Sequence, residues 1–127
     1  MFPRLDVAIQ DTPFDPSSND RLVQTRAGES GQPLYRVFIS LVGRDLPFVK
    51  KITYYLHESV TEPVRTVVRS PENPDCRLVA WLWGTFEVRA QVEDLKGGVH
   101  NLVHGLEYDK YFDEAKFAAE KLRLKKA

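Results

Sequence analysis

The sequence predicts an all-β domain of the sandwich type, followed by a C-terminal α-helix. Apolar and polar residues alternate over several short stretches, which is typical of half-buried strands. The stretch at residues 34–42 carries apolar side chains on both of its faces, which predicts a central strand of a sandwich. The alternation changes to helical spacing only near the end of the chain.

The chain has 127 residues, which suits one domain with its own hydrophobic core. We expect residues 1–20 to form an N-terminal segment that is partly loop, and residues 21–108 to form the sandwich. Residues 109–127 should form a helix packed on or beside the sandwich. There are no internal repeats and no sign of a second domain.

The strands are predicted from the alternation, taken in chain order. At residues 4–10 an edge strand and a frayed terminus fit equally well. Lys96-Gly97-Gly98 predicts a hairpin turn. Trp81 and Trp83 fall on the same face of one strand, and we expect at least one of them in the core. The remaining strands are expected at residues 21–26, 34–42, 49–57, 64–69, 77–82, 85–93 and 101–108.

The C-terminal helix is expected over about Tyr111 to Lys125. This segment is rich in strong helix formers, with acidic residues in the first turn and basic residues in the last, as the helix dipole favours. The helix should face the sandwich or cover a strand edge that is otherwise exposed. The residues at helical spacing are Tyr111, Ala115, Ala118, Ala119 and Leu122.

Composition and charge exclude several classes of protein. There are 18 basic and 18 acidic residues, so no basic excess favours nucleic-acid binding. The single cysteine, Cys76, cannot form an intramolecular disulfide and fits a reducing compartment. The N-terminus lacks the pattern of a signal peptide, and no apolar stretch is long enough to span a bilayer. We therefore expect a cytoplasmic protein that is not bound to a membrane.

Few residues offer catalytic or metal-binding chemistry. His100 and His104 would lie about 13 Å apart along a strand, too far to share one ion, and no further ligands complete a metal site. His57 and Ser59 could lie close together, but no Gly-x-Ser-x-Gly turn supports a nucleophile. We predict no catalytic residue, no metal and no cofactor.

Three short pieces of sequence occur in an order that is similar to a known family. They are Leu-His-Glu-Ser at residues 56–59, Pro-Val-Arg at residues 63–65, and Trp-Gly-Thr-Phe at residues 83–86. Their order and spacing over about residues 21–108 resemble the YEATS domain, and most of all its short prokaryotic forms. The resemblance implies an immunoglobulin-like β-sandwich. It also implies a possible reader of acylated lysines, since eukaryotic members read such lysines on histone tails.

The resemblance also implies a binding site for a flat acyl-lysine between two loops. Ser59 would hydrogen-bond the acyl amide, and His57 would shape its loop. Trp83 would form one wall and bind the acyl oxygen through its backbone amide, while Phe86 would support the floor. Gly84 would leave room for a ligand to approach the backbone.

Two positions depart from the family pattern. Val60 stands where the family has a second aromatic wall, and losing that stacking forfeits about 0.5–1.5 kcal/mol of binding. Leu82 stands where the family has glycine, so its side chain would crowd the channel or shift the loop.

The sequence therefore predicts a non-catalytic recognition module for a protein or peptide. The specific candidate ligand is an acylated lysine or a similar amide-bearing group. The alternatives are a small serine hydrolase that uses Ser59 and His57, and a structural adaptor between proteins.

Overall fold

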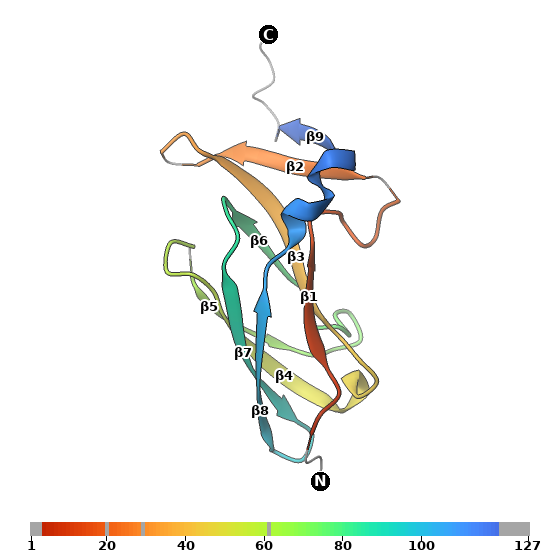
Figure 1. Ribbon diagram of the computed structural model, residues 1–127. Helices are drawn as coiled ribbons and strands as arrows, with labels where there is room; N and C mark the ends of the chain where they lie inside the picture. Colours follow the sequence, from red (N-terminus) through yellow and green to blue (C-terminus); the bar gives the residue numbers. More distant parts are fainter. Residues whose placement is uncertain (1–3, 20, 29, 61, 120–127) are drawn as a thin grey trace.

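Two β-sheets face each other in the computed structural model, which describes residues 4–19, 21–28, 30–60 and 62–119 (Figure 1). Two short 3-10 helices, η1 (Leu46–Phe48) and η2 (Tyr108–Glu114), lie between strands. The strands are β1 (Ala8–Thr12), β2 (Leu22–Ala27), β3 (Pro33–Val42), β4 (Val49–Tyr55), β5 (Val64–Val68), β6 (Leu78–Leu82), β7 (Glu87–Asp94), β8 (Val99–Gly105) and β9 (Lys116–Ala119).

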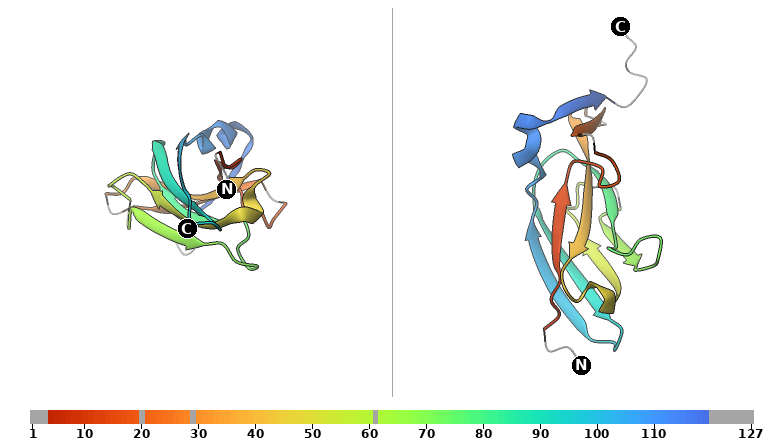
Figure 2. Two further views of the ribbon diagram at one scale, coloured as in Figure 1. Left: turned by 90° about the horizontal axis from the view of Figure 1, so that it is seen from below. Right: turned by 90° about the vertical axis from the view of Figure 1, so that its right-hand side faces the viewer.

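The first sheet is organised around β3, which is its longest strand. β1 and β2 pair with successive parts of one edge of β3, and β6 pairs with the other edge. The second sheet has the order β5-β4-β7-β8, with all neighbours antiparallel. Figure 2 shows the two sheets from below and from the side. The all-β sandwich predicted from the sequence is thus confirmed.

Every strand expected from the alternation is present in the described chain. Of the two alternatives left open near the N-terminus, the structure has the edge strand: β1 pairs with β3 from Ala8 to Thr12 and so overlaps the end of the predicted stretch at residues 4–10. The hairpin turn expected at residues 96–98 joins β7 to β8. β3 is buried on both faces in its second half, as expected of a central strand, since Phe38 is 5% exposed on the face opposite Val37 and Ile39.

The core lies between the two sheets and is almost entirely aliphatic. It combines the inward-facing residues of the strands with residues of the adjoining loops, and its aromatic members are Tyr54 and Tyr108. They are Leu5, Val7, Ile9, Val37, Ile39, Leu41, Val49, Ile52, Tyr54, Leu56, Val60, Cys76, Leu78, Ala80, Leu82, Val88, Ala90, Val92, Leu106 and Tyr108.

The expected C-terminal α-helix is wrong for the part that the structure describes. The 3-10 helix η2 ends at Glu114, and β9 then pairs in parallel with β2. Phe112 and Phe117 pack against Tyr35 of β3, with ring centroids 4.8 and 6.2 Å away. This aromatic contact and the free edge of β2 outweigh the local helical propensity. The edge of β2 is covered as expected, but by the strand β9 instead of a helix. The rest of the expected helix, residues 120–127, lies outside the described residues.

The helical content of the described chain consists of the two 3-10 segments. Neither is long and apolar enough to cross a membrane.

The expectation that Trp81 or Trp83 belongs to the core is also wrong. The inner face of β6 is formed by Leu78, Ala80 and Leu82. Trp81 and Trp83 alternate with these residues, so both tryptophans point to the outer face. Trp83 is 54% exposed. Because the smaller aliphatic residues fill the space between the sheets, the tryptophan rings are left on the outer surface near the loops.

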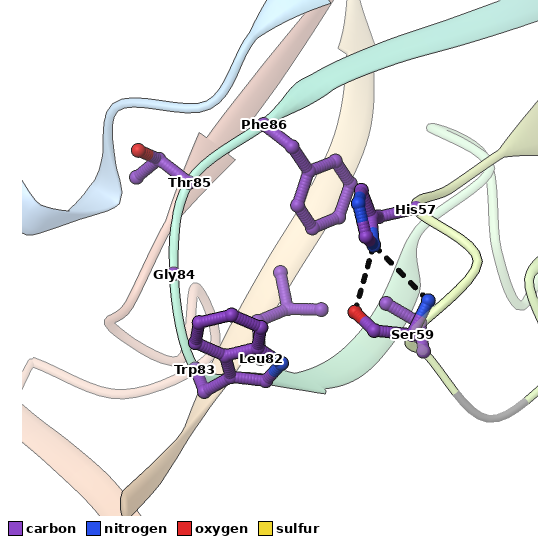
Figure 3. Close-up of a pocket in the computed structure, with 8 residues that line it drawn as sticks. His57, Ser59, Leu82, Trp83, Gly84, Thr85 and Phe86 are labelled. Carbon is purple, nitrogen blue, oxygen red and sulfur yellow. Dashed lines mark hydrogen bonds between the residues drawn. The ribbon is translucent and has the colours of Figure 1, made fainter.

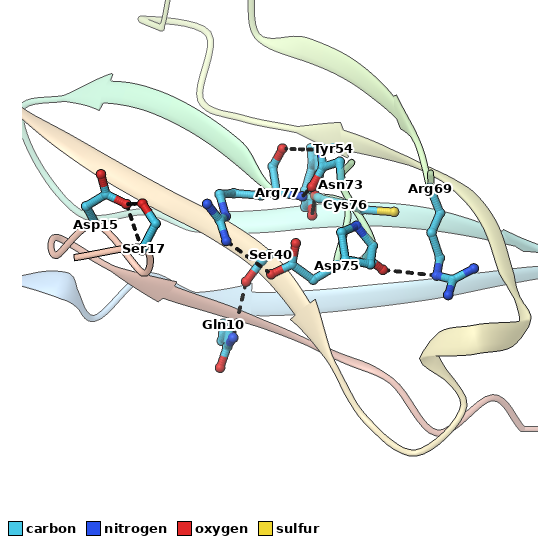
Figure 4. Close-up of polar contacts among 11 residues, drawn as sticks. Gln10, Asp15, Ser17, Ser40, Tyr54, Arg69, Asn73, Asp75, Cys76 and Arg77 are labelled. Atoms are coloured by element: carbon cyan, nitrogen blue, oxygen red, sulfur yellow. Dashed lines mark hydrogen bonds and ion pairs between the residues drawn. The ribbon is translucent and has the colours of Figure 1, made fainter. Parts of the chain in front are cut away.

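The connection between β5 and β6 is held by side chains, which fixes the start of β6 (Figure 4). Asn73 accepts from the backbone N–H of Arg77 at 2.8 Å and donates to its carbonyl at 3.0 Å. The buried Tyr54 hydroxyl of β4 donates to the Cys76 carbonyl at 2.7 Å, and Arg69 donates to the Pro74 carbonyl at 3.0 Å. These bonds tie the two sheets together ahead of the strand that leads to Trp83.

Candidate ligand-binding site

The loop after β4 is a tight turn that begins at His57. The backbone N–H of Val60 donates to the His57 carbonyl at 3.0 Å, which closes a four-residue turn. Just before it, the N–H of Leu56 donates to the Pro63 carbonyl at 2.7 Å, so the loop is also closed at its base. Ser59 occupies the third position of the turn. Its side chain is therefore presented on a short, hydrogen-bonded loop.

His57 and Ser59 are bonded to each other in a way that fixes the role of each. The Ser59 backbone N–H donates to His57 Nδ1 at 3.0 Å, so Nδ1 acts as an acceptor and carries no proton. Ser59 Oγ lies 2.8 Å from the same nitrogen, and its hydroxyl must therefore be the donor of that bond. The lone pairs of Ser59 Oγ remain available as acceptors at the pocket that Ser59 lines.

The loop between β6 and β7 carries Trp83, Gly84, Thr85 and Phe86. Its two ends are anchored, because the Tyr108 hydroxyl donates to the Gly84 carbonyl at 2.8 Å and the N–H of Leu106 donates to the Phe86 carbonyl at 3.0 Å. A Cβ atom added at Gly84 would meet no other atom within 4 Å. The backbone at this position thus borders open space.

The two loops enclose a pocket (Figure 3). In Figure 1 both loops lie at the end of the sandwich away from the hairpin turn that joins β7 to β8. It contains about 350 Å³ of empty space, part of which is open to solvent. Figure 3 shows Trp83 on one side, and Phe86 beside the His57 ring on the other. The lining residues are His57, Ser59, Val60, Leu82, Trp83, Gly84, Thr85 and Phe86. Every residue proposed from the sequence for this site lies in this set.

The two positions that depart from the family pattern have different effects here. Leu82 is 1% exposed and points inward from the end of β6, so it forms the base of the pocket rather than an obstruction at its mouth. Val60 is also mostly buried, at 9% exposed, and packs with the core while touching the pocket. The position of the family's second aromatic wall is therefore occupied by a small aliphatic side chain instead of a ring.

The pocket combines apolar walls with a single strongly directed polar group. Phe86 packs against the His57 ring at a centroid distance of 5.6 Å, which helps to orient the imidazole. Trp83 contributes an exposed flat face. An apolar group with an N–H donor near its middle fits this arrangement, because the walls contact carbon atoms and Ser59 Oγ accepts the hydrogen bond.

The same His57–Ser59 pair offers little support for serine hydrolysis. In a catalytic triad a carboxylate holds the imidazole nitrogen that faces away from the serine. No carboxylate of the described residues hydrogen-bonds to His57, and Nδ1 is shared with the Ser59 backbone N–H. The pair therefore orients the loop and lacks the third group of a triad.

The two other histidines lie on β8, and each bonds to a different buried carboxylate. His104 Nε2 lies 2.6 Å from Asp11 Oδ1, and the other oxygen of Asp11 accepts from the Glu107 backbone N–H at 3.0 Å. His100 Nε2 lies 2.7 Å from Asp94 Oδ2. The two histidines therefore have separate carboxylate partners.

Potential ligand atoms of Asp11, His104 and Glu107 lie within 4.8 Å of one another, a distance that a metal ion could bridge. Sequence reasoning missed this group, because Asp11 comes from β1 and the others from β8 and the residues after it. Both oxygens of Asp11 are already hydrogen-bonded within the fold, and Glu107 pairs with Lys110 at 3.2 Å. These contacts join β1 to β8, and we assign the group a structural role.

The pKa shifts agree with structural roles for these buried groups. The hydrogen bond from His100, with those from the Gly98 and Lys96 N–H groups, holds the pKa of Asp94 below its usual value. Burial raises the pKa of the Cys76 thiol to about 11, so this cysteine stays protonated and unreactive near neutral pH.

Two features of the site could not be found from the sequence. Tyr108 anchors the Gly84 carbonyl across 24 residues, and nothing in its local sequence indicates this partner. Thr85 also lines the pocket, but its side chain points away from the interior in Figure 3.

The two facing sheets, with a pocket between loops at one end, make this protein an all-β sandwich, and an immunoglobulin-like arrangement fits its strands. Within that class, the family model of the prokaryotic YEATS domain, pYEATS, matches residues 35–107, and the chain belongs to this family. No curated protein matches the chain in sequence.

Solved structures of the yeast protein Yaf9 share the fold. The Yaf9 YEATS domain recognising an H3K122suc peptide is 17% identical, with 84% of this chain and 75% of that chain covered and a TM-score of 0.55. The yeast AF-9 homolog protein Yaf9 is 19% identical, covering 80% and 64%, with a TM-score of 0.53. The Yaf9 YEATS domain bound to H3K27ac is 18% identical, covering 82% and 75%, with a TM-score of 0.50. At this level of identity the likeness establishes the fold alone.

Proposed function

We propose that this chain is a non-catalytic recognition module that binds an acylated lysine, or a similar amide-bearing group, in the pocket between its two loops. The main support is the hydrogen-bonding state of Ser59. Because its hydroxyl donates to His57, its oxygen is left as an acceptor beside apolar walls. The amide N–H of an acylated lysine is a donor with apolar carbon atoms on both sides, whereas the ammonium of an unmodified lysine would lose hydration among these walls.

The comparisons agree with this proposal without deciding it. Two of the Yaf9 structures are described with acylated histone peptides, one recognising H3K122suc and one bound to H3K27ac. Those ligands belong to the yeast protein. For this chain we propose a peptide or protein partner, with weaker binding than an aromatic cage would give because Val60 replaces a ring.

An NMR titration with acetyl-lysine and crotonyl-lysine peptides tests the proposal. We expect amide shifts at His57, Ser59, Trp83 and Gly84, and none from the same peptide with unmodified lysine. Trp83→Ala should abolish the shifts, and its melting temperature should stay close to that of the unmodified protein because the ring is 54% exposed. If saturating acyl peptide leaves those four amides unmoved, the proposal is wrong.

The same protein can be treated with a fluorophosphonate probe to test the absence of catalysis. We expect no labelling of Ser59, since no described carboxylate supports His57. Labelling that is lost in a His57→Ala variant would contradict a non-catalytic role and favour the hydrolase.

A further inference from the structure

The second sheet ends on one side in β5, whose outer edge pairs with no other strand of the described chain (Figure 2). At the opposite end of this sheet, β8 is joined to β1 of the first sheet, because His104 lies 2.6 Å from Asp11. The unpaired edge of a strand carries N–H and C=O groups that can bond to a further strand. The edge of β5 is therefore a candidate interaction surface.

The exposed face of β5 carries three uncharged, β-branched side chains, those of Val64, Thr66 and Val68. The two valines are 57% and 61% exposed. Proteins commonly protect a sheet edge with lysine or proline on such a face, and β5 has neither there. Arg65 lies on the opposite face, where its Nε donates to the Glu62 carbonyl at 2.6 Å. This contact lies within the same chain and does not have to break when the edge is paired.

The backbone of β5 directs the groups of these same three residues outward. The Pro63 carbonyl and the Arg69 N–H, at the two ends of the strand, both bond toward β4, at 2.7 and 3.0 Å. Along an antiparallel strand the bonding groups of successive residues point to alternate sides. The N–H and C=O groups of residues 64, 66 and 68 therefore point away from β4, toward the open edge. None of these residues is a proline, so each has a donor and an acceptor.

The exposed residues of β5 have the same order in both directions, which makes the edge complementary to itself. In an antiparallel pair with its two-fold axis at Thr66, this threonine faces its own copy, and Val64 of each strand faces Val68 of the other. All the outward backbone groups then find partners, and four valines form one apolar cluster. The charges also fit, because Glu62 precedes the strand and Arg69 follows it, so opposite charges lie at each end of the pair.

We propose that the open edge of β5 binds the same edge of a second copy of this chain, which joins the two second sheets into one continuous sheet. The contact is isologous, as in most homodimers. The loop after β4 leads into β5, so antiparallel pairing places the two pockets at opposite ends of the joined sheet. The dimer therefore leaves both pockets open, and the inference does not depend on the proposed function.

The dimer should be weak and dependent on concentration. A pair of five-residue strands buries less surface than the roughly 1,200–2,000 Å² of a stable interface, so we expect a dissociation constant of about 10 µM to 1 mM. Sedimentation velocity over this range of protein concentration measures it. The mass should rise from that of one chain toward that of two.

A matched pair of double variants tests which surface forms the dimer. Val64→Lys with Val68→Lys places like charges opposite each other across the two-fold axis and should raise the dissociation constant at least about 10-fold. Val99→Lys with Val103→Lys is the control and should leave the constant unchanged. These two valines of β8 are 60% and 57% exposed and lie in the same cross-strand rows of the same sheet face. All four positions are exposed, so melting temperatures should stay similar.

A disulfide tests the register of the pair. Residues that share hydrogen bonds across an antiparallel pair have Cα atoms about 5.5 Å apart, a distance that a disulfide can span. Thr66→Cys should therefore give a covalent dimer under mild oxidation. Val68→Cys should not, because the copies of this residue would be separated by about 13 Å along the strand. The native Cys76 is 0% exposed and should not contribute.

A chain that remains a monomer at 1 mM overturns the inference, and the open edge would then be left for a strand of another protein. A dimer that persists in the β5 double variant, or that is lost in the β8 control, overturns it as well. Equal cross-linking of Thr66→Cys and Val68→Cys contradicts the two-fold pairing. If the β5 double variant is unfolded, the comparison of the two cysteine variants decides. Failure of acetyl-lysine peptides to bind would overturn the proposed function and leave this inference intact.

Discussion

The histidines of this chain occupy two regions that use the same side chain in opposite ways. In the loop region, His57 is exposed and bonds to Ser59 two residues away. In the seam between β1 and β8, His104 is largely buried and bonds to Asp11, which is 93 residues away in sequence. The first contact orients a surface loop and the second joins two sheets. The role of a histidine is therefore indicated by its hydrogen-bond partner and its burial, more than by its presence in the sequence.

This comparison predicts that the seam controls stability and the loops control binding. The largest effect is expected from Asp11→Ala in the seam. The change leaves His104 and the Glu107 N–H without their acceptor in a buried site, which should lower the free energy of unfolding by about 2–3 kcal/mol. Urea unfolding followed by tryptophan fluorescence measures it. Asp113→Ala, at an exposed position, is the control and should change stability by less than about 0.5 kcal/mol.

Tyr108→Phe tests whether the two regions are coupled. The tyrosine is 1% exposed, and its hydroxyl donates to the Gly84 carbonyl of the pocket loop. We expect a loss of about 1.5 kcal/mol in the free energy of unfolding, together with weaker binding of acetyl-lysine peptide because the loop is less fixed. Tyr55→Phe, on the exposed face of β4, should change neither quantity. Unchanged peptide affinity in a destabilised Tyr108→Phe protein would show that the regions are independent.

Ser59→Ala tests the loop region by itself. The hydroxyl is exposed, so the unfolding free energy should stay within about 0.5 kcal/mol of the starting protein. Peptide affinity should fall about 5-fold, because one hydrogen bond to the ligand contributes about 1 kcal/mol. Thr85→Ala, whose side chain points away from the pocket, should bind as before. Equal affinities of the Ser59→Ala and unchanged proteins would contradict the acceptor role of Ser59.

The smallest effect is expected in the pH dependence of the Asp94–His100 pair, which lies at the hairpin between β7 and β8 outside the seam. The hydrogen bond from His100 lowers the pKa of Asp94 in the folded state below 3.8. The folded state therefore favours the ionised carboxylate. This stabilisation is fully present at pH values above the pKa of Asp94 in the unfolded state, and it is lost as the pH falls through the lower pKa of Asp94 in the folded state. The stability difference between the unchanged protein and Asp94→Asn should be steady near pH 5 and shrink toward pH 2. Thermal unfolding across this range measures it, and a difference that grows on acidification would contradict the sign.

Local pattern was enough to predict most of the sandwich. Period-two burial is a property of each strand alone, so the inner faces of β4 and β7 could be read from residues such as Ile52, Tyr54, Val88 and Val92. The loops that follow β4 and β6 could be placed together only through the family resemblance. Within them, the direction of the Ser59 hydrogen bond required the coordinates.

The C-terminal segment shows where local pattern fails. Its alanine-rich spacing favours a helix when the segment is considered alone. In the folded protein the segment pairs with the edge of β2 and packs against the ring of Tyr35, and these contacts depend on residues far away in the sequence. Local pattern also fails for Trp81. The alternation correctly places Trp81 on the same face as Trp83, but that face is the outer one, because Ala80 and Leu82 fill the inner face.

The sequence by itself therefore determined most of the strands and their inner faces, because these depend on short-range periodicity, while the order of its short motifs indicated the two loops of the pocket. The tertiary structure alone decided three further things. These are the strand that replaces the C-terminal helix, the buried Asp11–His104 contact, and the hydrogen bond from Tyr108 to the Gly84 carbonyl of the pocket loop. All three join segments that are far apart in the chain, and such contacts depend on which edges and faces remain open once the sheets have formed.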